Sequence, residues 1–225
     1  MEIMCLGDSV TDGFWYEGGY RLTLCRLLEE NGFADRVKFV GVNYSGNCYS
    51  NAHCGFSSFS IDDIPDSVTG GRAGISSQLD RIFASCKPDI TLLQIGTNDI
   101  LSLYKLDEAG ERLERLAERV FEGMGGGILY IALIPDMDAC DNTYIPKEFF
   151  TPESMDKCVA DYNDQVRAAV VRLCEKGHDA RLADVHDVVP KKLLHDGVHP
   201  SEEGYRRMGE FWYGIISSEL EGASL

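Results

Sequence analysis

The stretch DITLLQI (Asp89–Ile95) is the most informative segment for the fold, because its apolar side chains run almost without interruption. A strand in a parallel sheet is covered on both faces, so its sequence reads as a continuous apolar run rather than an alternating one. We therefore predict a buried parallel strand here, with further strands at Met4–Leu6, Val37–Val42, Ile128–Ile134 and Arg181–Val185.

Amphipathic stretches separate these strands, and leucines at helical spacing in residues 18–31 are one example. The same periodicity predicts helices at residues 74–86, 107–122 and 155–176 and after Ser201, whereas the polar residues 43–72 read as a loop. Alternation of strands and helices is typical of an α/β fold. We predict a three-layer α/β/α sandwich with a five-stranded, mostly parallel sheet in the flavodoxin-like order 2-1-3-4-5.

The composition indicates one domain over residues 1–225. The chain has 44% hydrophobic and 26% charged residues, which is ordinary for a soluble globular protein. Its length is sufficient for one sizeable hydrophobic core.

The net charge of −16 restricts the partners that we expect. An acidic surface repels nucleic acid and anionic membranes, so we predict neither as a partner. The longest apolar run, residues 128–134, is too short to cross a bilayer. The acidic surface favours a small-molecule substrate that is neutral, or whose charge lies away from the bulk field.

The cysteines and the N-terminus favour a cytoplasmic protein. The eight cysteines form no C-x-x-C pair and no zinc-like spacing, and no segment resembles a secretory signal. A secreted protein trimmed of its signal would have the same sequence. No pattern in the sequence indicates an oligomeric state.

Polar motifs follow three of the predicted strands. Ser9 follows the first strand, Asn98 follows the strand at Asp89–Ile95, and His199 lies beyond the last strand, three residues after Asp196. The carboxyl ends of parallel strands share one edge of the sheet, so we expect these side chains to meet there. A serine, a histidine, a carboxylate and an amide donor are the groups that acyl transfer requires.

A metal site is the alternative for the histidines. His195 and His199 are four residues apart, but the intervening Asp196-Gly197 predicts a turn rather than a helix. We therefore predict no metal, and the expected chemistry needs no cofactor.

The motifs resemble those of the SGNH or GDSL hydrolase superfamily. Gly7-Asp8-Ser9, Gly96-Thr97-Asn98-Asp99 and the D-x-x-H of Asp196–His199 match three of its blocks in order. Gly18-Gly19-Tyr20-Arg21 and the His53–Phe59 stretch are similar to the acetyl xylan esterase-like branch, carbohydrate esterase family 3. The absence of G-x-S-x-G argues against the α/β-hydrolase fold.

The resemblance implies roles for individual residues. It implies a catalytic triad of Ser9, Asp196 and His199, and an oxyanion hole made by the N–H groups of Ser9 and Ser58 and the Asn98 amide. Ser58 stands where the family has glycine. A backbone N–H is still present at this position, but a positive φ in the turn would favour glycine over serine. Gly55 is therefore the alternative donor. The remaining candidates for lining the substrate site are Asp8, His53, Gly55, Phe56, Thr97 and Val198.

The resemblance implies a serine esterase that acts on small acyl esters, above all acetyl esters, of carbohydrates or other polar alcohols. An acetylated oligosaccharide is one such substrate. The alternatives are a lipase- or thioesterase-like acylhydrolase, or a non-catalytic glycan-binding protein on the same fold. The aromatic residues Trp15, Tyr16, Phe56 and Phe59 are candidates either for a cleft wall or for the core.

Overall fold

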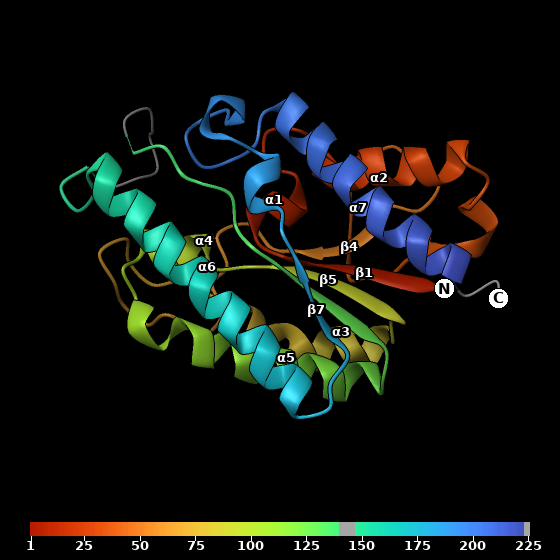
Figure 1. Cartoon of the computed structure of the whole chain (residues 1–225), viewed down its shortest axis with the longest axis horizontal. Helices are drawn as coiled ribbons and strands as arrows, with labels where there is room; N and C mark the ends of the chain where they lie inside the picture. The colour runs from red at the N-terminus through yellow and green to blue at the C-terminus, as the bar shows by residue number, and fades with distance from the viewer. Residues whose placement is uncertain (140–146, 223–225) are drawn as a thin grey trace.

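The computed structural model describes residues 1–139 and 147–222, in which helices flank a central sheet (Figure 1). The sheet has seven strands: β1 (Glu2–Gly7), β2 (Lys38–Phe39), β3 (Asn43–Tyr44), β4 (Ala52–Gly55), β5 (Ile90–Gln94), β6 (Ile128–Ala132) and β7 (Ala180–Ala183). The order is β3-β4-β1-β5-β6-β7, and β2 pairs with β1. All pairs are parallel except β3 with β4.

The predicted fold class is confirmed, but the predicted count of five strands is wrong. Two short strands share the place of the predicted second strand: β2 lies beside the start of β1 (Glu2 opposite Lys38), and β4 beside its end (Leu6 opposite Cys54). The chain passes so close to β4 at Gly41 that a Cβ there would lie 2.2 Å from the His53 carbonyl oxygen. The polar composition of residues 43–72 concealed β3 and β4. The other positions keep the predicted order.

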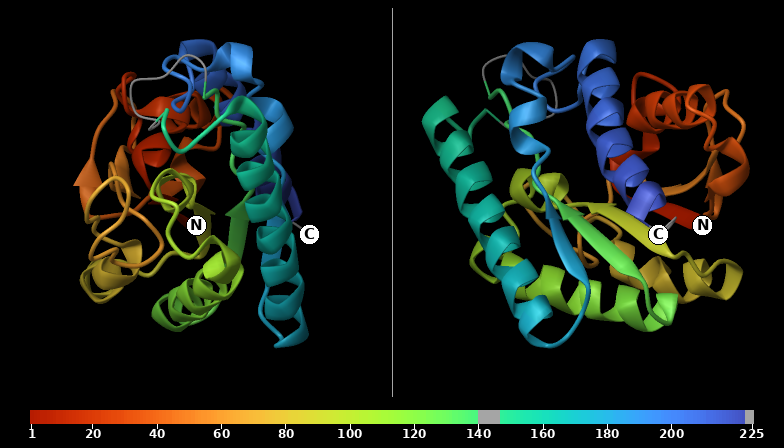
Figure 2. Two further views of the ribbon diagram at one scale, coloured as in Figure 1. Left: turned by 90° about the vertical axis from the view of Figure 1, so that its left-hand side faces the viewer. Right: turned by 45° about the vertical axis from the view of Figure 1, so that its right-hand side comes forward.

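The longer helices are α2 (Gly19–Glu30), α3 (Leu79–Ser85), α5 (Ala109–Met124), α6 (Pro152–Glu175) and α7 (Glu202–Gly222). Helices α1 (Ser9–Asp12) and α4 (Thr97–Leu101) are short, and 3-10 turns occur at Ala34–Arg36, Ile75–Gln78, Leu106–Glu108, His186–Val188 and Lys191–Leu193. Figure 2 shows α2 and α7 together on one side of the sheet, and α5 and α6 on the other.

Side chains that alternate along β1 supply both cores. Met4 and Leu6 pack with residues of α3, α5 and α6, whereas Ile3 and Cys5 pack with residues of α2 and α7. Successive side chains of a strand point to opposite faces, so both faces of β1 are buried. This burial on two faces explains the continuous apolar runs in the sequence.

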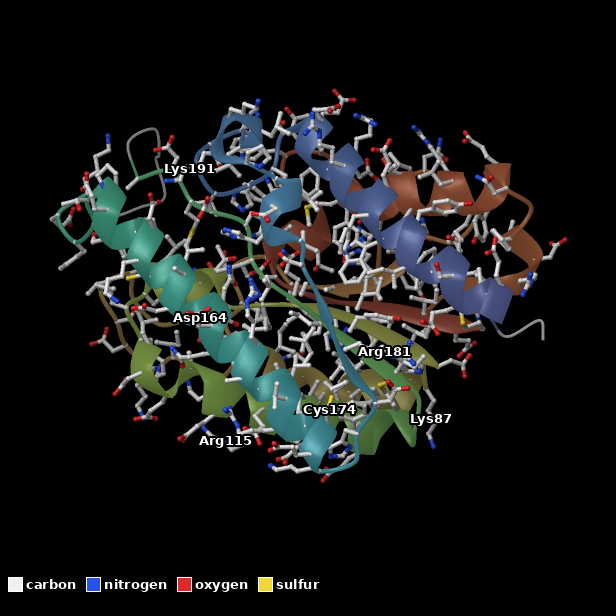
Figure 3. All side chains as sticks on the ribbon, viewed as in Figure 1. Lys87, Arg115, Asp164, Cys174, Arg181 and Lys191 are labelled. Carbon is white, nitrogen blue, oxygen red and sulfur yellow. The ribbon has the colours of Figure 1, made fainter. Side chains whose placement is uncertain are left out.

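The outer helix faces are polar. Figure 3 shows Arg115 on α5 and Asp164 on α6, and both residues are exposed. Within residues 1–139 and 147–222, no helix combines the length and the apolar character that crossing a bilayer requires.

The short helices α1 and α4 begin where β1 and β5 end, which brings Ser9 and Asn98 to one edge of the sheet. Gly96 makes the turn into α4 with a φ of +122°. A Cβ at this position would lie 2.1 Å from Cζ of Tyr162, whose hydroxyl donates a 2.6 Å hydrogen bond to the Ile95 carbonyl. Only glycine fits both this conformation and this contact.

Replacing Gly96 with alanine is therefore expected to lower the free energy of unfolding by about 2–4 kcal/mol, through overpacking and a strained φ. Urea unfolding followed by circular dichroism measures the change. Gly214→Ala is the control, because Gly214 lies exposed on α7 with no atom within 4 Å of the added Cβ. The control is expected to be neutral or stabilising by up to about 1 kcal/mol. A loss below about 1 kcal/mol for Gly96→Ala would contradict the stated packing.

Candidate active site

Ser9 is the first residue of α1, immediately after β1. Asp8 caps this helix, because its Oδ1 accepts a 3.0 Å hydrogen bond from the Val10 N–H. Burial raises the pKa of Asp8 to about 6, and the Val10 N–H opposes that rise. Ser9 itself is only 6% exposed, so the turn holds its hydroxyl in a site with little solvent around it.

His199 lies against Ser9, although 190 residues separate them in the chain. The distance from His199 Nε2 to Ser9 Oγ is 2.9 Å, and His199 Nδ1 lies 2.8 Å from Asp196 Oδ2. An ionised carboxylate only accepts hydrogen bonds, so Nδ1 carries the proton and the lone pair of Nε2 faces the serine hydroxyl. This tautomer is the one that a general base for Ser9 requires.

Asp196 is held by its own loop as well as by His199. Its Oδ1 accepts hydrogen bonds from the backbone N–H groups of Val198 (3.0 Å) and His199 (2.8 Å). Burial raises the pKa of this carboxyl, but the hydrogen bonds from His199 and Trp15 outweigh burial and hold the pKa well below its usual range. Asp196 is therefore an anion at neutral pH.

Trp15 makes the remaining contact to Asp196. Its indole N–H donates a 2.7 Å hydrogen bond to the same Oδ2 that His199 contacts. The residue has a φ of +70°, a conformation that costs a bulky residue about 1–2 kcal/mol. The indole ring packs against His195, and Phe14 packs against the His199 ring at a centroid distance of 4.6 Å. The strained backbone of Trp15 thus lies directly beside the carboxylate that holds His199.

Ser58 and Asn98 line the same cavity as Ser9. Ser58 has a φ of +70°, which is the left-handed conformation that glycine adopts most easily. The Asn98 side-chain amide donates a 2.9 Å hydrogen bond to the Phe59 carbonyl, which joins α4 to the turn that holds Ser58. The amide has a second N–H, because a primary amide carries two donors.

A buried ion pair supports the same turn. Asp99 accepts hydrogen bonds from Arg112 Nη2 at 2.5 Å and from the Ile61 N–H at 3.1 Å. Burial raises the pKa of Asp99 to about 7, and Arg112 opposes the rise. The bond from Ile61 fixes the segment after Ser58 to α4, which carries Asn98, and the bond from Arg112 holds α4 against α5.

A cavity of about 90 Å³ lies beside Ser9 and His199. Its lining comprises Ser9, Phe14, Ser57, Ser58, Arg72, Asn98, Leu101, Val198 and His199. For comparison, an engineered protein cavity of about 150 Å³ binds benzene. The space beside Ser9 therefore suits a group of a few heavy atoms.

Of the predicted lining residues, Val198 lines the cavity. The structure places the others elsewhere. Asp8 and Thr97 are buried at the starts of α1 and α4, outside the cavity lining. His53 is buried in β4, where its Nδ1 accepts the Gly55 N–H and its Nε2 contacts the Ser45 hydroxyl. Burial lowers the pKa of His53 to about 3, so the ring is neutral.

The Gly55 N–H is thus engaged by His53, and Gly55 does not line the cavity, whereas Ser58 lines it together with Ser9. Phe56 stacks on Phe59, and both pack against the core. The His195 side chain contacts the Tyr16 hydroxyl through Nδ1 at 3.1 Å and packs against the Trp15 ring, and its backbone N–H donates a 2.7 Å hydrogen bond to the His199 carbonyl.

Sequence reasoning missed several residues of the site. It gave no site role to Phe14, Ser57, Arg72 and Leu101, which line the cavity, and it offered Trp15 only as a wall or core residue. The contacts of Trp15 and Arg72 join segments that are distant in the sequence, and neither residue lies in a recognisable motif.

Comparison with known proteins identifies the family of the chain. The GDSL-like Lipase/Acylhydrolase family matches residues 5–207, and the chain belongs to this family. A "Multidomain esterase" from Ruminococcus flavefaciens is 32% identical over 237 residues. The match covers 99% of this chain but 29% of that relative, so the chain spans less than a third of the relative's length.

Two solved structures show the same fold. The Clostridium thermocellum family 3 carbohydrate esterase has a TM-score of 0.72 and 25% identity, with 99% of this chain and 98% of that chain covered. A carbohydrate esterase family 3 protein from Talaromyces cellulolyticus has a TM-score of 0.74 and 19% identity, with 99% of each chain covered. The resemblance inferred from the motifs is confirmed.

The Trp15–Asp196 contact yields a prediction. Trp15→Phe keeps an aromatic ring but removes the N–H, so Asp196 has more charge available to stabilise protonated His199. The acid limb of the kcat/KM profile for an acetyl ester is expected to move to higher pH, with kcat about tenfold lower. Tyr213→Phe, which removes a polar group from an aromatic residue on α7, is the control. An unchanged pH profile in Trp15→Phe would mean that the indole only fills space.

Proposed function

We propose that the chain is a serine esterase domain that hydrolyses short acyl esters, above all acetyl esters, of carbohydrates or other polar alcohols. The observation that carries the proposal is the unbroken hydrogen-bonded series Ser9–His199–Asp196 at a small cavity. The similarity to a family 3 carbohydrate esterase from Clostridium thermocellum supports the carbohydrate part of the proposal.

In the proposed reaction, Ser9 Oγ attacks the ester carbonyl while His199 Nε2 takes the hydroxyl proton. The carbonyl oxygen becomes an oxyanion that accepts hydrogen bonds from the N–H groups of Ser9 and Ser58 and from the Asn98 amide. His199 then gives its proton to the leaving alcohol, and the acyl group remains on Ser9.

Water completes the cycle. His199 removes a proton from a water molecule, whose oxygen attacks the acyl-enzyme, and the carboxylic acid leaves as Ser9 regains its proton. Asp196 stays ionised throughout and stabilises the imidazolium form of His199. Backbone and side-chain groups of the chain supply every role in this sequence.

The cavity size bears on the acyl group. A space smaller than one that holds benzene suits an acetyl group better than a long acyl chain. This favours an acetyl esterase over the lipase-like alternative, which would need a long apolar groove beside Ser9.

Hydrolysis of 4-nitrophenyl acetate, butyrate and octanoate by the wild type and variants tests the proposal. We expect kcat/KM to fall steeply with chain length. Ser9→Ala is expected to lose about 10⁴-fold or more, and Asn98→Ala about 10²–10³-fold. Ser218→Ala, a serine exposed on α7, is the control and should match the wild type. Octanoate preferred over acetate, or activity that survives Ser9→Ala, would refute the proposal.

A further inference from the structure

Arg72 brings a positive charge into the catalytic cavity. It lies in the loop between β4 and α3, and its side chain lines the cavity together with Ser9 and Asn98. The triad and the oxyanion donors do not include it. A cation beside the reacting atoms therefore needs its own explanation.

Neutral groups hold the guanidinium in place. Nε donates to the Ser102 hydroxyl at 2.9 Å and to the Thr69 hydroxyl at 3.3 Å, and Nη1 donates to the Ser58 carbonyl at 3.4 Å. These contacts fix the direction of the side chain. Because an arginine carries five N–H groups, further N–H donors of the guanidinium remain for a ligand.

Within residues 1–139 and 147–222, no carboxylate lies within ion-pair distance of Arg72. Burial lowers the pKa of Arg72 and the nearby Asp99 opposes that change, although an arginine remains charged in proteins. Asp99 is itself already bound by Arg112 at 2.5 Å. The chain thus maintains a half-buried positive charge that no carboxylate of its described residues contacts.

The net negative charge of the whole molecule makes a local cation more important for binding an anion. A chain with a net charge of −16 repels anions in general, so an anionic substrate needs a local cation to bind. Arginine is well suited to this task, because its planar fork binds a carboxylate through two parallel hydrogen bonds.

We propose that Arg72 is an anion-binding subsite, and that the preferred ester carries a carboxylate close to its reacting carbonyl. This inference rests on the proposed esterase function and names a feature of its substrate. The carboxylate has two sources, namely the alcohol part of the ester or the far end of a short dicarboxylic acyl group. Arg72 recognises the same chemistry in either case.

Two matched ester pairs test the subsite and separate the sources. The first compares 4-acetoxybenzoate with its neutral methyl ester, which places the charge on the alcohol part. The second compares 4-nitrophenyl hemisuccinate with 4-nitrophenyl butyrate, which places the charge on the acyl part. For each pair, the ratio of kcat/KM for the charged ester to that for the neutral ester is the readout.

We expect the wild type to prefer the charged member of one pair. Arg72→Gln should lower that ratio about tenfold or more, and Arg72→Lys should retain part of it. Raising the salt concentration should also lower the wild-type ratio. Arg115→Gln is the control: it removes one positive charge from the exposed face of α5 and should leave the ratio unchanged.

A wild-type ratio that shows no preference in either pair, or an equal loss on both members in Arg72→Gln, would overturn the subsite. Thermal unfolding of each variant checks that the loop still folds, and Arg72→Lys provides the second test if Arg72→Gln does not. The proposed function fails separately, through activity on neutral esters that persists in Ser9→Ala.

Titration of Ser9→Ala with succinate and benzoate measures anion binding without turnover. Adding Arg72→Gln to this variant should weaken the binding of one of the two anions about tenfold or more. Equal binding with and without Arg72→Gln would also overturn the subsite.

Discussion

The hydrogen bond between Ser9 Oγ and His199 Nε2 depends on the whole sheet, because its partners stand near opposite ends of the chain. Ser9 follows β1, and His199 lies in the loop between β7 and α7. The two strands are separated in the sheet by β5 and β6. A change in strand order or direction would move one partner to the other edge, so the parallel pairing is a condition of the chemistry.

Smaller interactions refine this arrangement at a cost in stability. Trp15 and Ser58 both have a φ of +70°, and each lies directly beside the reacting groups. The buried Asp99–Arg112 pair also has a high desolvation cost, and breaking such a pair typically destabilises a protein by about 3–5 kcal/mol. The apolar packing on both faces of the sheet offsets these costs. Trp15, Ser58 and the Asp99–Arg112 pair therefore all lie near the edge of the sheet where the candidate site is.

Much of this arrangement was predictable from local sequence. The apolar stretch Asp89–Ile95 corresponds to β5 and its flanks, and the motifs around Ser9, Asn98 and His199 indicated one shared edge. The predicted strand Val37–Val42 was less accurate, because only Lys38–Phe39 pairs with β1 and β4 completes that side. A four-residue strand in a polar segment has no periodicity long enough to detect.

The contacts of Trp15 and Arg72 were beyond sequence reasoning for a different reason. Trp15 reaches Asp196 across 181 residues, and Arg72 reaches the cavity only because the loop folds back onto Ser58 and Ser102. His53 illustrates the opposite error, since a histidine within a family motif is buried and bound to Ser45 and Gly55. Motifs predict which residue types meet, but backbone conformation decides which of them face the substrate.

Covalent labelling is the decisive test of Ser9 as the nucleophile. Diethyl 4-nitrophenyl phosphate transfers its diethylphosphoryl group to an activated serine, releases 4-nitrophenolate and forms a stable analogue of the acyl-enzyme. Mass spectrometry of the digested protein locates the label while activity on an acetyl ester is followed. We expect one diethylphosphoryl group, on Ser9, in proportion to the activity lost. Inactivation with the label on another residue, or full activity with Ser9 phosphorylated, would contradict it.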